Sequence, residues 1–445
     1  MRVALFTVGC KLNQYETEAI AEELEDCGFE RVDFSQPAEV YIINTCTVTK
    51  ESDYSSRQAI YRAKRRSPQA QIVVTGCYAQ LEKEFLEKLP GVSLVVKQDQ
   101  KGELANRIAN LFGDQSIKPK EKKKDDEFFG FTVCKHAKHT RALVKIQDGC
   151  DKRCSYCVVP LARGKEKNRE VESILAEINC LVENGYKEIV LTGVHIGRYN
   201  SAIGRSLPDG WQAGASGEKD GLNLVRLSDK ILTDTKVERL RFTSIDPKEF
   251  SDELIDLISK SKRIARHLHI PLQSGDDHIL SLMKRDYTTD EYRKLLVKIK
   301  SAIPEAMTGA DVIVGFPSET DEQFENTYQF ILSSPLDYLH VFSYSDRKGT
   351  VASQFPNKVP RQIIRKRSEI LHLLGKKKWE NYLEGFIGKT LEVLIEQKRD
   401  KETNRLSGLS DNYIRVLLDG EDSLKNKIVS VSIFRREGNI LVGKI

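Results

Sequence analysis

The sequence predicts an α/β protein with three consecutive parts: an amino-terminal parallel sheet, a partial (β/α)6 barrel and a small carboxy-terminal all-β barrel. Over most of the chain, short runs rich in β-branched residues alternate with helical patterns, which indicates parallel strands joined by helices. The last ~60 residues instead hold short strand-like runs separated by polar turns, a pattern typical of a small β-barrel. At 445 residues, of which 40% are hydrophobic, the chain is long enough for two to four domains.

In the amino-terminal part, residues 1–115, a cysteine stands just beyond the end of each of three predicted strands. The strand runs and the cysteines that follow them are RVALFTV with Cys10, VYIIN with Cys46 and QIVVTG with Cys77. Because the carboxyl ends of parallel strands meet at one edge of a sheet, we expect the three thiols to lie together and to hold a metal site. The alternative is that they are core residues, since buried free cysteines are common.

The second part, residues 139–378, follows a linker at residues 116–138 that is rich in Lys and Asp. Its six predicted strands are ALVKIQ, EIVLTG, RLRFTSI, HLHIPLQ, ADVIVGF and YLHVFSY. Six β/α units in series predict a partial barrel, whose chemistry belongs at the carboxyl ends of the strands. A long loop is expected from Tyr199 to Leu222, and residues 379–445 make up the carboxy-terminal barrel.

Cys150, Cys154 and Cys157 form a CxxxCxxC motif just after the first barrel strand. Three thiolates leave one iron of a four-iron cluster without a protein ligand, and such an open iron can bind a substrate directly. The alternative, a structural zinc site, needs four ligands, and the nearest histidines, His136 and His139, precede the strand. The motif therefore favours an iron–sulfur cluster with one open iron.

Polar and glycine-rich residues follow the barrel strands, where a bound nucleoside would lie. The candidate contacts, with one residue from the cysteine loop, are Tyr156, Thr192, Gly193, Gly197, Thr243, Ser244, Gln273 and Gly315. Each position alone is weak evidence, because glycine, serine and proline also close ordinary strand-to-helix turns. His195 and Asp246 are candidates for acid or base groups, with helix caps or hydrogen-bonded loop residues as the alternative.

Composition and charge restrict the compartment and the class of partner. No apolar stretch approaches the ~20 residues of a membrane span and no cationic leader is present, so we expect a cytoplasmic protein without membrane contact. Nine cysteines at motif spacing favour metal ligation over a disulfide framework, and Cys27 and Cys180 fall in helical patterns as core residues. The net charge of +5 is concentrated in four basic runs, which makes a polyanion partner plausible.

Together these residues resemble the methylthiotransferase family, and the CxxxCxxC motif resembles that of the radical S-adenosylmethionine (SAM) superfamily. The resemblance covers nearly the whole chain and implies an amino-terminal methylthiotransferase domain, a radical SAM barrel and a carboxy-terminal TRAM domain. It implies two 4Fe-4S clusters and SAM as cofactors. The implied ligands are Cys10, Cys46 and Cys77 for the sulfur-delivering cluster, and Cys150, Cys154 and Cys157 for the radical-generating cluster. Such enzymes convert a C–H bond into C–S–CH3.

The segments TGVHIGRY, HLHIPLQSGDDHILSLMKRDYTTDEY and HVFSYSDRKGTVASQFP look like the branch that acts on N6-threonylcarbamoyladenosine at position 37 of tRNA. The implied partners are the tRNA anticodon stem-loop, an electron donor such as flavodoxin or ferredoxin, and a sulfur source. We expect the basic residues after the cysteine loop to lie close to the radical site and to contact RNA: Arg163, Lys165, Lys167 and Arg169. The alternatives are isopentenyladenosine in tRNA, an aspartate of a ribosomal protein, and a non-enzymatic iron–sulfur RNA-binding sensor.

Overall fold

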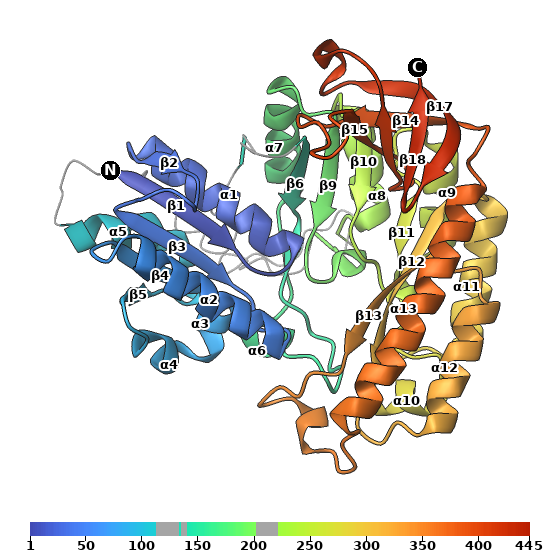
Figure 1. Ribbon diagram of the computed structural model, residues 1–445, viewed down its shortest axis with the longest axis horizontal. Helices are drawn as coiled ribbons and strands as arrows, with labels where there is room; N and C mark the ends of the chain where they lie inside the picture. The colour runs from blue at the N-terminus through green and yellow to red at the C-terminus, as the bar shows by residue number, and fades with distance from the viewer. Residues whose placement is uncertain (113–132, 135–139, 202–220) are drawn as a thin grey trace, which may run out of the picture.

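The computed structural model describes residues 1–112, 133–134, 140–201 and 221–445. Figure 1 shows an amino-terminal sheet domain in blue beside a barrel in green to orange, with a small carboxy-terminal barrel in red at one end. The three-part α/β architecture is therefore confirmed. The expected linker lies outside the described residues apart from Val133 and Cys134, and so does most of the expected loop from Tyr199 to Leu222. In the described part of the chain, no helix has the length and apolar character of a membrane span.

The amino-terminal domain is a five-stranded parallel sheet in the order β2-β1-β3-β4-β5. Its strands are β1 (Arg2–Thr7), β2 (Glu30–Val32), β3 (Val40–Thr45), β4 (Gln71–Gly76) and β5 (Val92–Val95), and its helices are α1 (Lys11–Asp26), α2 (Lys50–Arg66), α3 (Cys77–Leu81), α4 (Lys83–Glu87) and α5 (Leu104–Phe112). Val40 and Ile42 pack under α1 and α5, whereas Tyr41 and Ile43 pack under α2. This alternation follows from the two-residue period of a strand and buries both faces of the sheet.

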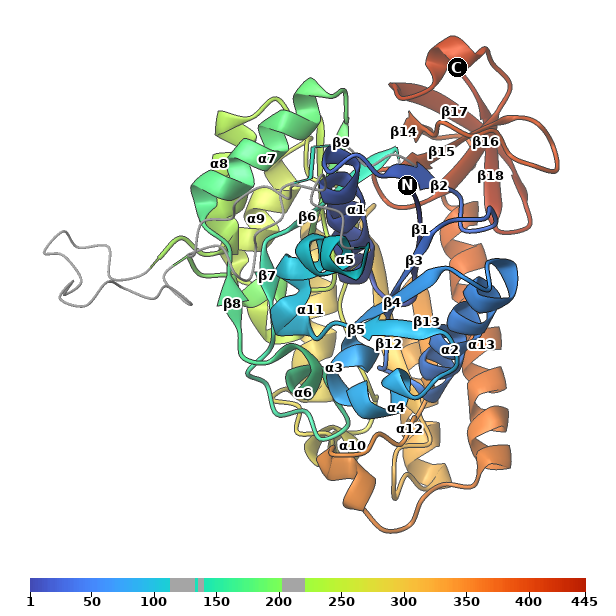
Figure 2. The same cartoon turned by 90° about the vertical axis from the view of Figure 1, so that its left-hand side faces the viewer.

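The second domain contains the six predicted strands as two three-stranded parallel sheets, β6-β9-β10 and β11-β12-β13, which approach at a bridge between Leu240 and Ile264. These strands are β6 (Arg141–Lys145), β9 (Glu188–Thr192), β10 (Arg239–Phe242), β11 (His267–His269), β12 (Met307–Val314) and β13 (Tyr338–Ser343), and a short ribbon is formed by β7 (Gln147–Asp148) and β8 (Lys167–Asn168). The helices are α6 (Val159–Arg163), α7 (Val171–Glu183), α8 (Leu224–Asp234), α9 (Asp252–Lys260), α10 (Asp277–Leu282), α11 (Thr289–Ala302), α12 (Asp321–Ser333) and α13 (Arg361–Glu384). Capping boxes at Thr288 and Thr320 fix the starts of α11 and α12. In both views, α13 runs along the outside of the barrel toward the carboxy-terminal domain (Figures 1 and 2).

The carboxy-terminal domain is a closed barrel of five strands in the order β14-β15-β16-β18-β17. Its strands are β14 (Thr390–Ile395), β15 (Leu406–Ser410), β16 (Arg415–Leu418), β17 (Ile428–Glu437) and β18 (Ile440–Lys444). Arg241, fully buried on β10, donates to the carbonyl oxygen of Asp411 over 2.8 Å and to the Glu188 carboxylate over 2.6 Å. Arg239 donates to the carbonyl oxygen of Glu392 over 2.9 Å. The small barrel is thus fixed to the large one by buried charged groups.

Cys134 and Cys180 form a disulfide, which corrects the expectation that Cys180 is only a core residue of a helix. The sequence separation of 46 residues gives no local signal for this pairing. Val133 and Cys134 lie between α1 and α7: the backbone N–H of Cys134 donates to Glu22 of α1 over 3.0 Å, and that of Val133 donates to Glu177 of α7 over 3.3 Å. The position of this segment in the tertiary structure, and not the spacing of the cysteines, therefore decides that Cys134 pairs with Cys180.

Candidate active site

Cys10, Cys46 and Cys77 follow β1, β3 and β4, which are neighbours in the sheet, so the three thiols lie at one edge as predicted. Cys10 is exposed, while Cys46 and Cys77 are buried. Gly9 has φ +109°, and a Cβ atom there would lie 2.6 Å from Cys46 Cβ, so glycine is required for the two loops to approach each other. Burial raises the pKa of the Cys77 thiol to about 11. A metal must therefore displace protons from this site when it binds.

A buried ionic network lies beside these thiols and joins the first domain to the second. The carboxylate of Glu16, on α1, forms ion pairs with Lys101 at 2.6 Å and with Arg163 at 2.9 Å. Arg163 also forms an ion pair with Asp148 at 3.0 Å. Burial raises the pKa of Glu16, but the charges of Arg163, Lys101 and Lys145 outweigh burial and hold it well below the ordinary value. With three cations to two carboxylates, the network leaves a net positive charge beside the cysteines, which suits an anionic cluster.

Arg163 and Arg169 are engaged inside the protein, which does not fit the expectation that they contact RNA. Both are buried: Arg163 pairs with Glu16 and Asp148, and Arg169 pairs with Glu177. Only Lys165 and Lys167 of that run are exposed. The sequence alone could not separate these cases, because the partner carboxylates are far away along the chain.

Replacing Arg163 by Met is expected to lower the free energy of unfolding by roughly 3 kcal/mol, because it leaves buried carboxylates with too little positive charge. Urea unfolding followed by circular dichroism measures this loss. The matched control is Lys165→Met, two residues away on an exposed side chain, which should change stability by less than about 0.5 kcal/mol. Equal stability of both variants would show that the network does not support the domain junction.

Cys150, Cys154 and Cys157 occupy the loop between β7 and α6, at the carboxyl end of the barrel. The Cys154 Sγ atom accepts from Arg285 over 3.4 Å, and Cys150 Sγ lies 3.8 Å from His195 Nδ1. Burial raises the pKa of the Cys157 thiol to about 12, so this site too must lose protons on binding a metal. In the described residues no fourth thiol joins either set. Three sulfur donors beside a cation fit a four-iron cluster with one open iron, and do not fit a closed zinc site.

His195 and Asp246 are both engaged by protein groups. His195 Nε2 lies 2.7 Å from Glu249 Oε1, and burial opposes protonation, but hydrogen bonds to Cys150 and Glu249 raise the pKa of His195 to about 9. Asp246 pairs with Arg285 and, over 3.1 Å, with Lys152. The Asp246 carboxylate also accepts a hydrogen bond from the backbone N–H of Lys248, so Asp246 caps a short helical turn, which is the alternative role that the sequence allowed. Asp246 therefore positions the Arg285 that contacts the cysteine loop.

A cavity of about 220 Å³ lies beside the cysteine loop of the barrel, where the amino-terminal domain also contributes to its wall. Val48 and Thr49, just after Cys46, form one part of its wall, while Tyr156 and Cys157 form another. Gln273, at φ +67°, and Asp311 also line it. Tyr156 and Gln273 are thus candidate contacts that the structure brings together at the cysteine loop.

The other candidate contacts are divided. Thr243 and Ser244 line a second, larger cavity of about 530 Å³. Thr192 is buried in β9, and the space beside three glycines is filled by the protein itself. A Cβ atom at these positions would lie 2.8 Å from Gln147 O for Gly193, 2.3 Å from Glu249 Oε2 for Gly197 and 2.3 Å from Ile364 Cγ1 for Gly315. The tight packing accounts for these glycines without a ligand.

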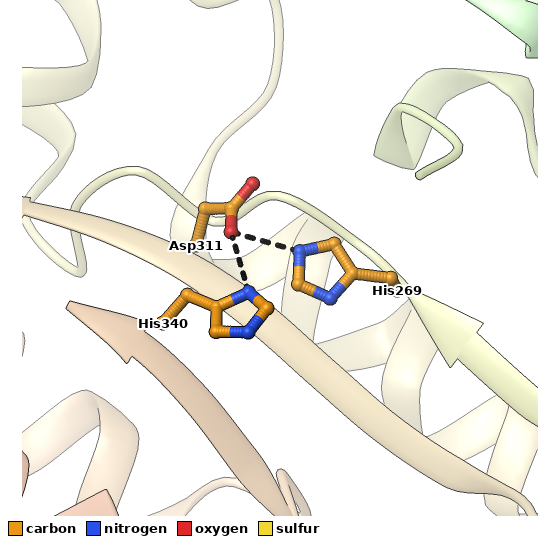
Figure 3. Close-up of side chains that lie close together, drawn as sticks. All are labelled: His269, Asp311 and His340. Carbon is orange, nitrogen blue, oxygen red and sulfur yellow. Dashed lines mark hydrogen bonds and ion pairs between the residues drawn. The ribbon is translucent and has the colours of Figure 1, made fainter. Parts of the chain in front are cut away.

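A cluster formed by His269, Asp311 and His340 on β11, β12 and β13 was not predicted from the sequence (Figure 3). His269 Nε2 lies 2.9 Å and His340 Nδ1 lies 3.3 Å from Asp311 Oδ1. The two histidines outweigh the burial of Asp311 and hold its pKa well below the ordinary value. A signal was present for Asp311 and His340, because each is a charged or ionisable residue among mainly apolar strand residues, in ADVIV and YLHVF.

Two family models match this chain, and together they cover both cysteine-bearing domains. Residues 2–97 match the family described as Uncharacterized protein family UPF0004, and residues 144–331 match the Radical SAM superfamily. The threonylcarbamoyladenosine tRNA methylthiotransferase MtaB of Aquifex aeolicus is 39% identical over 440 residues, covering 97% of this chain and 100% of the relative. The MtaB of Bacillus subtilis is 38% identical, covering 97% and 94%. The tRNA-2-methylthio-N(6)-dimethylallyladenosine synthase of Lawsonia intracellularis is 34% identical, covering 99% and 98%.

Among solved structures, the radical SAM methyltransferase TsrM of Kitasatospora setae superposes with a TM-score of 0.53 at 16% identity, covering 77% of this chain and 74% of that chain. At that identity the likeness concerns the fold alone. The full-length relatives share both cysteine-bearing domains and exceed a third of identical residues. The chain therefore belongs to the radical SAM methylthiotransferase family.

Proposed function

We propose that this protein converts N6-threonylcarbamoyladenosine at position 37 of tRNA, next to the anticodon, to its 2-methylthio derivative. The observation that carries the proposal is the cavity of about 220 Å³ whose wall contains Cys157 on one side and the residues after Cys46 on the other. Methylthiolation needs a radical made at one site and sulfur delivered from another. The cavity is lined by Cys157 of one cysteine set and by the segment that follows Cys46 of the other, so it lies where the two cysteine-bearing domains meet.

The cofactors are two 4Fe-4S clusters and SAM, as membership of the family implies. Cys10, Cys46 and Cys77 hold one cluster, and Cys150, Cys154 and Cys157 hold the other. When bound, this set supplies the radical, the sulfur and the methyl group, chemistry that protein side chains do not provide. The chain itself supplies positive charge beside each cysteine set, from Arg163 and from Arg285.

Mass spectrometry of tRNA nucleosides from a strain lacking this protein tests the substrate. We expect 2-methylthio-N6-threonylcarbamoyladenosine to disappear and its precursor to accumulate, and a plasmid copy to restore the product. Unchanged nucleosides would reject tRNA and favour the ribosomal aspartate or an iron–sulfur RNA-binding sensor.

The second candidate substrate is the isopentenyl form of the adenosine in tRNA. It is favoured by the dimethylallyladenosine synthases, which match the chain over nearly the same length at 34% identity. The same nucleoside profile separates the candidates, because loss of the 2-methylthio isopentenyl product would assign this branch.

The anticodon stem-loop binds where the three domains meet. Lys11, Arg141 and Lys398 line a cavity of about 320 Å³ at this junction, one residue from each domain. Lys398 and its neighbour Lys401 are exposed on the loop between β14 and β15. Lysines at such a rim contact phosphates, and therefore set affinity and its dependence on salt.

Replacing Lys398 and Lys401 together by Ala is expected to weaken the binding of tRNA regardless of its nucleotide sequence. The slope of log Kd against log salt concentration should fall by about 1 for each phosphate that the variant no longer binds. Fluorescence anisotropy over a salt series measures this slope. Lys294→Ala with Lys298→Ala, on the exposed face of α11, is the matched control. An unchanged slope in the first variant would remove the small barrel from the RNA-binding surface.

The reaction places the protein in the cytoplasm with mature tRNA. Reduction of the cluster requires a one-electron donor such as flavodoxin or ferredoxin, and turnover requires a sulfur source. Stimulation of product formation by each reduced donor in a purified system identifies which one serves.

A further inference from the structure

The second cavity, of about 530 Å³, is built from all three domains. Lys11 comes from α1, the histidines His267, His269 and His340 from the barrel strands, and Tyr413 from the turn between β15 and β16. Tyr413 has φ +68° and stacks on His267 with ring centroids 4.4 Å apart. This non-glycine residue is held in a left-handed conformation, which costs energy unless its contacts outweigh the strain. The small barrel therefore forms part of the wall of this cavity.

Strand register places the cluster of Figure 3 on the inner face of the barrel. Asp311 pairs with His340 across β12 and β13, so their side chains lie side by side. His269 pairs with Gly309, two residues before Asp311 on the same face of β12. A Cβ atom at Gly309 would lie 3.2 Å from His269 Nδ1, so the missing side chain gives the imidazole room to turn toward Asp311.

Asp311 also separates the two cavities. It lines the large one together with His269 and His340, and it lines the cysteine-side cavity together with Tyr156 and Cys157. A ligand that reacts beside the cysteines and extends past Asp311 must meet the two histidines. In adenine, C2 and the carbon that bears N6 are separated by one ring nitrogen. A base with C2 in the cysteine-side cavity therefore directs its N6 substituent away from the cysteines.

The charge of the large cavity favours an anion. Among the described residues that line it, Asp311 is the only carboxylate, against Lys11, Arg415 and the imidazoles of His269 and His340. Burial holds the pKa of the third imidazole, His267, well below its ordinary value, so it adds no charge. Arg415 is already paired with Asp400 over 2.8 Å. Each imidazole faces Asp311 with one ring nitrogen and keeps its second ring nitrogen for a ligand. Both ring nitrogens that face Asp311 lie within hydrogen-bonding reach of a single oxygen, Oδ1, and the same three side chains also have the spacing of a metal site.

We propose that His340 and His269, positioned by Asp311, bind the carboxylate of the N6-threonylcarbamoyl group and thereby select this adenosine over one with a neutral N6 substituent. This inference rests on the proposed function and names its specificity-determining residues. His340 is the main contact, because it is half exposed to the cavity, whereas His269 is buried. Lys11 adds a positive charge at the same cavity.

The test measures equilibrium binding of two anticodon stem-loop RNAs, one with N6-threonylcarbamoyladenosine and one with unmodified adenosine, to the full-length protein with reconstituted clusters under anaerobic conditions. The wild-type protein should bind the modified loop about tenfold more tightly, the effect of one hydrogen bond to a charged group. In His340→Ala the ratio of the two Kd values should fall toward one. His340→Gln, which keeps an N–H donor, should give an intermediate ratio. His372→Ala, on an exposed position of α13, is the matched control and should keep the wild-type ratio.

Three outcomes would overturn the inference alone, given a wild-type protein that methylthiolates the modified loop: an unchanged ratio in both His340 variants, an equal loss of affinity for both loops, or a zinc or manganese ion that is bound by the wild type and absent from His340→Ala. An equal loss of affinity for both loops would mean that His340 contacts the RNA backbone and not the N6 substituent. A bound metal would mean that the cluster is a cation site. A wild-type protein that leaves the modified loop unreacted overturns the proposed function as well. Iron content and circular dichroism of each variant confirm that it is folded.

Discussion

Replacing any one of Cys150, Cys154 and Cys157 by Ala is expected to reduce formation of 5'-deoxyadenosine from SAM to background. Only these three thiols are available to the cluster in that loop, so two remaining ligands leave two irons open and the cluster is lost. About half of the bound iron should disappear, because the other cysteine set lies on a separate domain. Chromatography of the reduced protein with SAM, together with iron analysis, measures both quantities.

The matched control is Cys27→Ala, at a cysteine that ends α1 and lies outside both sets. It should retain the wild-type iron content and SAM cleavage. Wild-type rates of 5'-deoxyadenosine formation in the three single variants would reject the assignment of the radical cluster.

Replacing Cys10, Cys46 and Cys77 together by Ala is expected to abolish methylthiolation while SAM cleavage continues. The three residues lie at the edge of the amino-terminal sheet, whereas Cys150, Cys154 and Cys157 belong to the barrel. Iron content should again fall by about half, and liquid chromatography with mass spectrometry should detect 5'-deoxyadenosine but no methylthiolated RNA.

Full retention of iron in this triple variant would show that the strand-end cysteines are core residues. Loss of both activities together with all iron would show that the two sites are not independent. Because removal of the sulfur atoms at Cys46 and Cys77 also alters packing, each preparation is compared with the wild type by thermal unfolding.

Much of the fold and both cysteine sets could be predicted from local patterns. The two-residue period of β3 and the strand-to-helix alternation define a parallel sheet, and in such a sheet the ends of β1, β3 and β4 must share an edge. The CxxxCxxC spacing defines a short loop whose thiols converge without help from distant residues. Local sequence was sufficient here because the geometry is set within a few residues of each cysteine.

The buried and shared parts of the site could not be predicted in this way. Arg163 belongs to a basic run, yet its partner Glu16 lies 147 residues away along the chain. The Cys134–Cys180 disulfide likewise depends on where a distant segment returns. In each case the local pattern is compatible with an exposed side chain and with a buried one. Whether the side chain is buried depends on a partner residue far away in the sequence.

The sequence by itself determined the order of the three domains, the strand-end positions of six cysteines and the family. Only the tertiary structure decided that the segment after Cys46 and the loop of Cys157 line one cavity. It also decided that Asp311 lines both this cavity and the larger one lined by His269, His340 and Tyr413. The physical reason is that strand periodicity fixes which face a side chain occupies, whereas a cavity depends on how separate domains pack. Buried contacts between domains, such as those of Arg163 with Glu16 and of Arg241 with the carbonyl oxygen of Asp411, set that packing, and they join residues that no local pattern connects.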